Sequence, residues 1–269
     1  MQCIFNWELN MPITWTAQYQ DERANIEIQG IIIASHQEFN GYISGEFSEK
    51  IRHYSGVGQI EVCLRNLKDT GFQTDDLERE LNHKISKADW GEYFAYHQLE
   101  TSFNITIPWP SQWDKKKNTH SLPGADIIGL KREDDTVTFV FGEVKTSEEI
   151  RHPPQVVTKK ADGLITQLKR FEDGKIISNL IQWLLIRAHG KAWESDFDSA
   201  LRSYLTENRL FTCIGILVRD TTPTPKDLSC IPEHLTLRCK VNLYAFYLPA
   251  PLHDCITKSI PRGIAYAGE

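Results

Sequence analysis

The segment PGADIIGLKREDDTVTFVFGEVKTSEE, residues 123–149, holds two apolar runs that are joined by a charged turn and that each carry acidic residues. Two-residue periodicity in the second run places four side chains on one face of a strand: Phe139, Phe141, Glu143 and Lys145. Both faces of this strand are mostly apolar, which predicts a central strand that is covered on both sides. A charge at the end of such a strand is costly unless it is paired or binds an ion.

The two runs are predicted to form a β-hairpin whose register sets two acids against each other. A two-residue loop at residues 134–135 pairs its flanking residues, Glu133 and Thr136, and the same register places Asp126 directly across from Glu143. Opposed side chains in a hairpin have Cβ atoms about 4.5–5.5 Å apart, and two carboxylates at that distance repel each other. A bulge would shift this pairing, so the prediction depends on the register.

A divalent cation between the carboxylates would make this arrangement favourable, because Mg²⁺ takes carboxylate oxygens at about 2.0–2.1 Å. Lys145 stands roughly 6–7 Å further along the same face, where it can reach the edge of such a site. A Glu-x-Lys triplet on its own is usually a pair of solvated charges on a helix surface. This triplet instead ends an apolar strand and faces an acid, which favours a functional interpretation.

Composition limits the class of protein. The 269 residues include 41% hydrophobic and 25% charged residues, with a net charge of -6, which is ordinary for a soluble globular protein and unlike a protein that coats nucleic acid. The six cysteines form no C-x-x-C pair, which argues against a zinc ribbon and suits free thiols in a reducing cytoplasm. No apolar run is long enough to span a bilayer.

The order of predicted elements indicates an α/β or α+β fold around one central sheet. Residues 1–72 read as strand-rich, and a helix with capping-box spacing is expected near Thr74. Further helices are expected at about residues 87–100, 155–172, 176–188 and 193–207, and two further strands in LFTCIGILVRD and LTLRCKVNLYAFYLP. We divide the chain into an accessory or partner-docking region, residues 1–80, and a second domain, residues 81–269.

The pattern GADIIGL…FGEVK resembles the core of the PD-(D/E)xK nucleases, the restriction-endonuclease-like superfamily. Asp126 matches the first acid of that pattern, Glu143 the second and Lys145 the lysine. Asp126 follows Gly-Ala rather than proline, a departure in a half-motif that is often degenerate. The resemblance implies a central mixed sheet flanked by helices over roughly residues 87–250.

The resemblance also implies roles for individual residues. Asp126 and Glu143 would hold Mg²⁺ or Mn²⁺, the backbone carbonyl of Val144 would be a further ligand, and Lys145 would act on the attacking water or the phosphate. Glu92, on the helix before the hairpin, matches a glutamate that touches a second metal or a metal-bound water. Its alternative is a surface acid. Gln167 matches a glutamine of related exonucleases, with helix packing as its alternative.

More narrowly, the length, the strand-rich beginning and the GADIIGL–EVKTS core are similar to HamA-like proteins, with AbpA-type proteins as relatives. These are nuclease subunits of the Hachiman antiphage system, encoded beside a superfamily 2 helicase. The resemblance implies a DNA-cutting effector subunit with a helicase partner. Basic pairs at Lys159-Lys160 and Lys169-Arg170 would then contact the phosphate backbone without reading sequence, as would Lys115 to Lys117. A solvated face is the alternative.

Two competing interpretations remain. A catalytically silent nuclease-like subunit could dock a helicase or sense DNA, and a sequence-specific restriction enzyme would need a recognition module that the sequence does not show. A zinc-dependent protease and a P-loop ATPase are excluded more clearly, because the chain has neither an H-E-x-x-H zinc motif nor a G-x-x-x-x-G-K-[ST] phosphate loop. A set of tryptophans is expected to serve in core and rim packing: Trp109, Trp113, Trp183 and Trp193.

Overall fold

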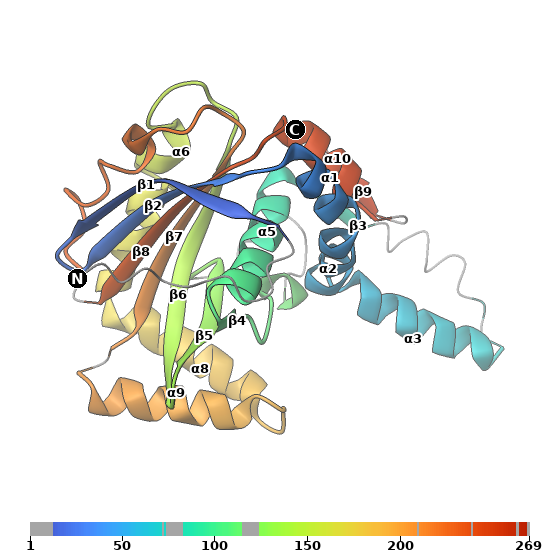
Figure 1. The fold of residues 1–269 in the computed structure, drawn as a ribbon. Coiled ribbons are helices and arrows are strands. Elements are labelled where there is room, and N and C mark those ends of the chain that lie inside the picture. Colours follow the sequence, from blue (N-terminus) through green and yellow to red (C-terminus); the bar gives the residue numbers. More distant parts are fainter. Residues whose placement is uncertain are drawn as a thin grey trace.

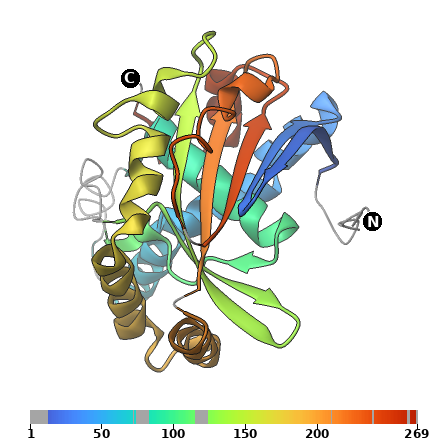
Figure 2. The ribbon, with the colours of Figure 1, turned by 90° about the vertical axis from the view of Figure 1, so that its left-hand side faces the viewer.

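The computed structural model describes residues 13–71, 73, 83–114, 124–208, 210–237, 239–261 and 264–267. Within these residues a seven-stranded mixed sheet has the order β1-β2-β8-β7-β6-β5-β4, and β3 (His83–Ile85) pairs with β9 (Ile264–Tyr266) in a separate parallel ribbon. Helices lie on both sides of the large sheet (Figures 1 and 2). The predicted fold class, a central mixed sheet flanked by helices, is confirmed.

The predicted hairpin is formed by β5 (Ile127–Glu133) and β6 (Thr136–Ser147), joined by a two-residue turn in which Asp134 has φ of 51°. The antiparallel register runs from Glu133 opposite Thr136 to Ile127 opposite Gly142, as predicted. The short edge strand β4 (Ile105–Thr106), which the sequence did not suggest, pairs with β5.

The centre of the sheet is parallel and buried. β6 pairs in parallel with β7 (Thr212–Arg219), which pairs in parallel with β8 (Lys240–Tyr247). All eight residues of β7 are buried, as expected for a strand that is covered on both faces. The two strands predicted after residue 210 are thus confirmed.

Two cores, one on each face of the sheet, divide the side chains of β6 as the two-residue period predicts. Val140 and Val144 belong to the core that includes α5 (Lys87–Ser102), whereas Phe139 and Phe141 belong to the core on the opposite face. That second core includes residues of α7 (Leu164–Lys169), α8 (Gly174–Ala188) and α9 (Glu194–Thr206). Glu143 and Lys145 continue the row of the two phenylalanines.

The helix α5 is set by its sequence. Ser86 caps its N-terminus by accepting a hydrogen bond from the backbone N–H of Asp89, whose side chain bonds back to the Ser86 N–H. Gly91 lies against β6 so closely that a Cβ there would meet Thr146 Oγ1 at 1.9 Å. Glycine is therefore required where α5 crosses the strand that carries Glu143.

The N-terminal region is strand-rich only in part. β1 (Trp15–Arg23) and β2 (Ile26–Ile33) form a hairpin that joins the large sheet by parallel pairing of β2 with β8. Residues 36–69 then form α1 (His36–Ser44), α2 (Glu46–Tyr54) and α3 (Val57–Asp69), which corrects the expectation of strands up to residue 72. The buried residues of this stretch recur every three or four positions, a helical period that outweighs its glycines: Phe39, Tyr42, Ile43, Phe47, Ile51 and Tyr54.

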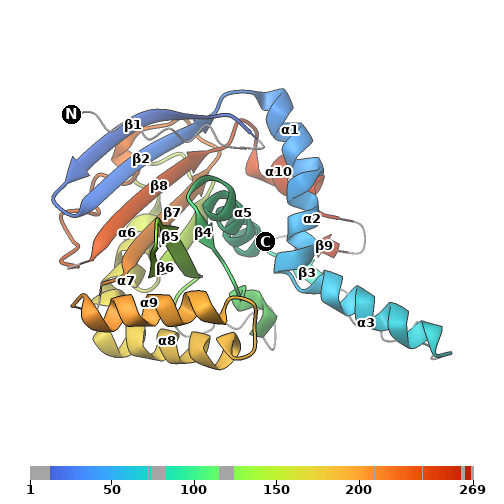
Figure 3. The same ribbon diagram turned by 60° about the horizontal axis from the view of Figure 1, so that its bottom comes forward.

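These helices cover the α5 side of the sheet, where α10 (Leu252–Ser259) packs against α1. Figures 1 and 3 show α3 extending away from the rest of the molecule. The helix expected near Thr74 lies outside the described residues. The division of the chain at residue 80 stays a prediction about partner docking.

The prediction of a single helix over residues 155–172 is wrong. The structure has α6 (Gln155–Thr158), a loop, α7, and a 3₁₀ turn at Arg170–Glu172. The loop closes on itself, because the N–H of Gly163 donates to the carbonyl of Lys159 and the Thr166 hydroxyl donates to the carbonyls of Lys159 and Lys160. The predictions for α8 and α9 are confirmed.

Candidate active site

Asp126 lies one residue before β5, and its hydrogen bonds hold it against Glu143. Its backbone N–H donates to the carbonyl of Gly142 at 3.0 Å, and its Oδ2 accepts from the N–H of Val144 at 3.0 Å. The regular ladder ends at the preceding pair, yet these two bonds flank Glu143 on both sides. The predicted meeting of the two acids is therefore realised by a side-chain bond rather than by a further ladder pair.

Glu143 and Lys145 lie close together on β6. Glu143 is only 6% exposed, and its Oε1 accepts a hydrogen bond from Lys145 Nζ at 2.7 Å. The Lys145 side chain remains 20% exposed. The triad is thus a buried acid, a partly buried acid and a partly buried lysine, gathered at the end of one hairpin.

The pKa values of Glu143 and Lys145 are both shifted by their surroundings. Burial, followed by the charge of Asp126, raises the pKa of Glu143 to about 8, although Lys145 acts in the opposite direction. Burial lowers the pKa of Lys145, but Glu143 and Asp126 outweigh it, so the net shift is upward. The ammonium therefore stays charged and faces both acids, while the raised pKa of Glu143 reflects first its burial and then the charge of Asp126.

Glu92 lies on α5 next to Gly91 and is 8% exposed. Its Oε2 accepts from Gln112 Nε2 at 2.9 Å, and the same amide donates to Asp89 at 2.8 Å. The alternative of a surface acid is wrong, because the side chain is buried. Whether Glu92 touches a metal stays a prediction.

A residue that the sequence analysis did not single out connects Glu92 to the triad. The Tyr96 hydroxyl donates to the backbone carbonyl of Asp126 at 2.7 Å. Burial, and then the charges of Glu92 and Asp126, raise the pKa of Tyr96 well above its usual value. Tyr96 follows Glu92 by four residues and shares its helix face, which was the available signal.

The predicted glutamine lies on α7. Gln167 is half-buried, and its Oε1 accepts from Arg170 at 2.7 Å. Two leucines of this helix, Leu164 and Leu168, pack near Gly215, the β7 partner of Glu143. A catalytic role for Gln167 stays a prediction.

The basic residues have different surroundings. Lys159 and Lys160 lie on the exposed loop between α6 and α7, where Lys159 pairs with Asp162 at 3.0 Å. The charge of Asp162 also contributes, as the last of several causes, to the raised pKa of Lys145. Lys169 and Arg170 are exposed at the end of α7, and Lys115 to Lys117 lie outside the described residues.

The donor set can be compared with what Mg²⁺ requires. Among the described residues, no three acidic, histidine or cysteine side chains converge to form a metal centre. Mg²⁺ is usually bound through one or two carboxylates and keeps several waters. The adjoining carboxyl groups of Asp126 and Glu143 supply oxygen donors of the kind and number that this requirement asks for. The carbonyl of Val144 as a ligand stays a prediction.

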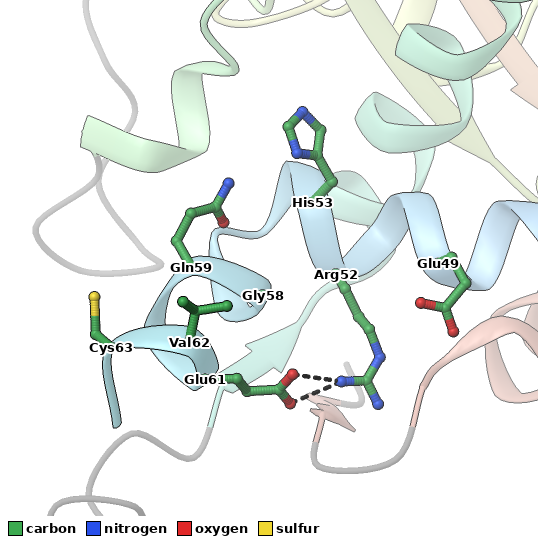
Figure 4. Close-up of a pocket in the computed structure, with 8 residues that line it drawn as sticks. All are labelled: Glu49, Arg52, His53, Gly58, Gln59, Glu61, Val62 and Cys63. Atoms are coloured by element: carbon green, nitrogen blue, oxygen red, sulfur yellow. Dashed lines mark hydrogen bonds and ion pairs between the residues drawn. The ribbon is translucent and has the colours of Figure 1, made fainter. Parts of the chain in front are cut away.

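A cavity of about 700 Å³ lies elsewhere, between α2 and α3 (Figure 4). None of the predicted site residues lines it. Within it Arg52 donates to both carboxylate oxygens of Glu61 at 2.7 Å, so this acid is compensated by an arginine. The chemistry of the cavity walls gives no reason to move the candidate site there.

Three further observations bear on identity. Among the described residues, no helix is long and apolar enough to cross a membrane. No curated protein matches the sequence. The family model named HamA matches residues 30–260, which include all of the predicted site residues and most of the chain. The chain therefore belongs to the HamA family.

Proposed function

We propose that this protein is a metal-dependent nuclease that hydrolyses DNA phosphodiester bonds, with Asp126, Glu143 and Lys145 as its catalytic residues. The observation that carries the proposal is the pairing of a buried Glu143 with Asp126 at the end of the β5–β6 hairpin. A fold that needed this corner only for packing would be more stable with uncharged residues there.

Each residue of the proposed site has its own role in this reaction. Asp126 and Glu143 would hold Mg²⁺ or Mn²⁺, with Val144 and Glu92 as further candidates. When bound, such an ion lowers the pKa of a coordinated water and offsets charge that develops on the phosphate. Lys145, 2.7 Å from Glu143, would orient the attacking water or bind a phosphate oxygen. The Tyr96 hydroxyl fixes the backbone of Asp126.

The HamA family implies a role in Hachiman-type antiphage defence. We infer that the protein is the effector subunit of such a system, that a superfamily 2 helicase is its partner, and that it acts in the cytoplasm. The absence of a phosphate-loop motif from the sequence supports an ATP-driven step on another chain. The net charge of -6 supports delivery to DNA by a partner rather than strong binding alone.

The test is cleavage of linear and circular DNA by the purified protein in Mg²⁺ or Mn²⁺, with and without the helicase and ATP. Glu143→Ala and Lys145→Ala are each expected to lower the rate by at least about 100-fold, since both remove groups that act on the reacting phosphate. Gln59→Ala, in the cavity of Figure 4, is the control and should cut normally. Cleavage that survives both site substitutions would contradict the proposal.

One observation favours a second candidate, a catalytically silent subunit that docks a helicase or senses DNA. The direct bond between Lys145 and Glu143 fills part of the acid's hydrogen-bonding capacity without a metal. Under this alternative the wild-type protein would bind DNA or its partner but cut nothing under any condition, with the helicase included.

A further inference from the structure

Two tryptophans lie against one arginine near the candidate site, and a third tryptophan packs on one of them. The guanidinium carbon of Arg187, on α8, lies 4.1 Å from the ring centroid of Trp183 and 5.8 Å from that of Trp109. Trp109 meets Trp113 edge to face, with centroids 5.0 Å apart. All three rings are half-buried, so each keeps part of its surface in water.

Hydrogen bonds hold this cluster in place. Asp114 Oδ2 accepts from Arg187 Nε at 2.8 Å and from Trp109 Nε1 at 3.2 Å. The Trp113 indole N–H donates to the carbonyl of His53 at 3.0 Å, and Arg187 donates to the carbonyl of Trp183 at 2.9 Å. The aromatic faces are thus ordered before any ligand arrives, which reduces the entropy lost on binding.

One side of the cluster reaches the site through the 3₁₀ turn Ser111–Asp114. The Ser111 hydroxyl lies 3.3 Å from the Tyr96 hydroxyl, which itself bonds to Asp126. Gln112, beside Trp113 in the chain, donates to Glu92.

The other side reaches the site through α8. Leu180 lies one helical turn before Trp183 and packs on Gly124, where a Cβ would meet Leu180 Cδ2 at 2.7 Å. Gly124 has φ of 133°, a conformation that also requires glycine, and it precedes Asp126 by two residues. The helix α8 therefore contacts the segment that carries the first acid, and the 3₁₀ turn reaches that segment through Tyr96.

We propose that Trp109, Trp113 and Trp183, together with Arg187, form a stacking platform for the bases of single-stranded nucleic acid, next to the nuclease site. Aromatic faces and a planar guanidinium accept any base by stacking, whereas a duplex keeps its base faces covered by neighbouring pairs. The sequence continues directly from Asp114 into Lys115, Lys116 and Lys117, which suits a polyanion.

This proposal rests on the proposed nuclease function and gives its substrate class: nucleic acid with a single-stranded segment. The proposal gives three of the four tryptophans, which were expected to serve in core and rim packing, a further role in binding. Trp183 and Trp193 both pack partly against the same core, so Trp193, at the start of α9, provides a matched control.

The test is binding of a fluorescent oligothymidylate of about 12 nucleotides, a length within the range that single-strand sites cover. Full-length protein is titrated in EDTA, so that no cleavage occurs, and a duplex of equal length is measured in parallel. Trp183→Leu is expected to weaken single-strand binding about five- to 150-fold, as loss of one stacked base does. Trp183→Tyr should bind nearly as well as wild type, and Trp193→Leu should bind normally.

Thermal melting of each variant separates lost stacking from lost folding. Unchanged single-strand affinity in Trp183→Leu, or an equal loss on the duplex, would overturn the platform. Equal losses in Trp183→Tyr and Trp183→Leu would do so as well. Because the titration needs no metal, the two proposals can fail separately. If wild type cuts DNA but Trp183→Leu binds normally, the nuclease function stands and the platform fails. If binding depends on Trp183 but no cleavage occurs, the platform stands and the nuclease function fails.

Discussion

Two clusters of buried charge lie on neighbouring strands and differ in how their charges are balanced. Arg219, the last residue of β7, and Asp227, on the 3₁₀ turn Pro225–Asp227, are both fully buried and form an ion pair. The second oxygen of Asp227 accepts from the Tyr247 hydroxyl at 2.9 Å, and His152 Nδ1 lies 2.7 Å from the first. On β6, by contrast, one lysine faces two acids.

The difference separates a structural role from a chemical one. Arg219 also donates to the carbonyls of Glu149 and Arg151, so the β7 cluster ties the loop after β6 to the sheet. Its cation has an anion, and both members of the pair make further hydrogen bonds. Glu143 has a raised pKa because it is buried and lies beside the charge of Asp126, so its carboxylate would gain from a bound cation.

Isosteric removal of one negative charge from each cluster gives the largest contrast. Asp227→Asn leaves Arg219 buried without its anion and is expected to lower the free energy of unfolding by about 3–5 kcal/mol. Glu143→Gln should leave that free energy unchanged or raised at pH 8, because it removes a carboxylate that burial disfavours. Urea unfolding at pH 8 measures both.

The pH dependence sharpens this contrast. Since the pKa of Glu143 is raised, its favourable contribution is fully present below its ordinary pKa and is lost as the pH rises through about 8. Wild type should therefore lose stability relative to Glu143→Gln between pH 5 and pH 8.5 (roughly the span of the shift). A cost for Glu143→Gln as large as that for Asp227→Asn would make Glu143 a structural residue.

The next largest effect on stability is expected where α5 packs closely on β6. Gly91→Ala adds a methyl group where Thr146 Oγ1 leaves no room, and we expect a loss of about 1–3 kcal/mol in the free energy of unfolding. Gly41→Ala, in α1, is the matched control, because no heavy atom lies within 4 Å of its added Cβ. Equal unfolding energies for the two variants would contradict the close packing of α5 on β6.

Metal affinity should depend on pH through the same acid. Below a pKa of about 8 the binding of Mn²⁺ must displace a proton from Glu143, so its affinity should rise by up to about tenfold per pH unit and level off above pH 8. Calorimetric titration in two buffers of different ionisation enthalpy counts that proton. Binding without proton release at pH 6.5 would exclude Glu143 as a ligand.

The smallest effect concerns the exposed loop before α7. Lys159→Gln and Lys160→Gln should each lower the salt dependence of DNA binding by about one ion while weakening all sequences equally. Anisotropy titrations over a range of salt concentrations measure this, and Lys226→Gln, on the 3₁₀ turn at Pro225–Asp227, serves as the control. An unchanged salt slope in both loop variants would assign these lysines to a solvated face.

The sequence was sufficient for the hairpin, because a two-residue turn fixes the register and alternation fixes which side chains share a face. The meeting of Asp126 with Glu143 and the place of Lys145 followed from that register. The helical spacing of residues 87–100 also identified α5, whereas its capping box at Ser86 was not predicted.

Other features depended on contacts that periodicity does not report. The break between α6 and α7 comes from a loop closed by Gly163 and Thr166, within a stretch whose composition suits a helix. The pairing of β2 with β8 joins residues more than 200 positions apart, and no local sequence pattern reports such a pairing. The gathering of Trp109 and Trp183 around Arg187 likewise depends on how α8 packs.

The central claim, that Asp126 and Glu143 form a site for a divalent cation, is tested most directly by thermal melting with Mn²⁺ at pH 8. At a concentration 100 times its dissociation constant, bound Mn²⁺ should stabilise wild type by about 2.7 kcal/mol, which corresponds to a rise in Tm of roughly 5–10 °C. Asp126→Asn and Glu143→Gln should lose this rise, and Gln167→Ala should keep it. A wild-type Tm that millimolar Mn²⁺ leaves unchanged, or an equal rise in all four proteins, would contradict the account.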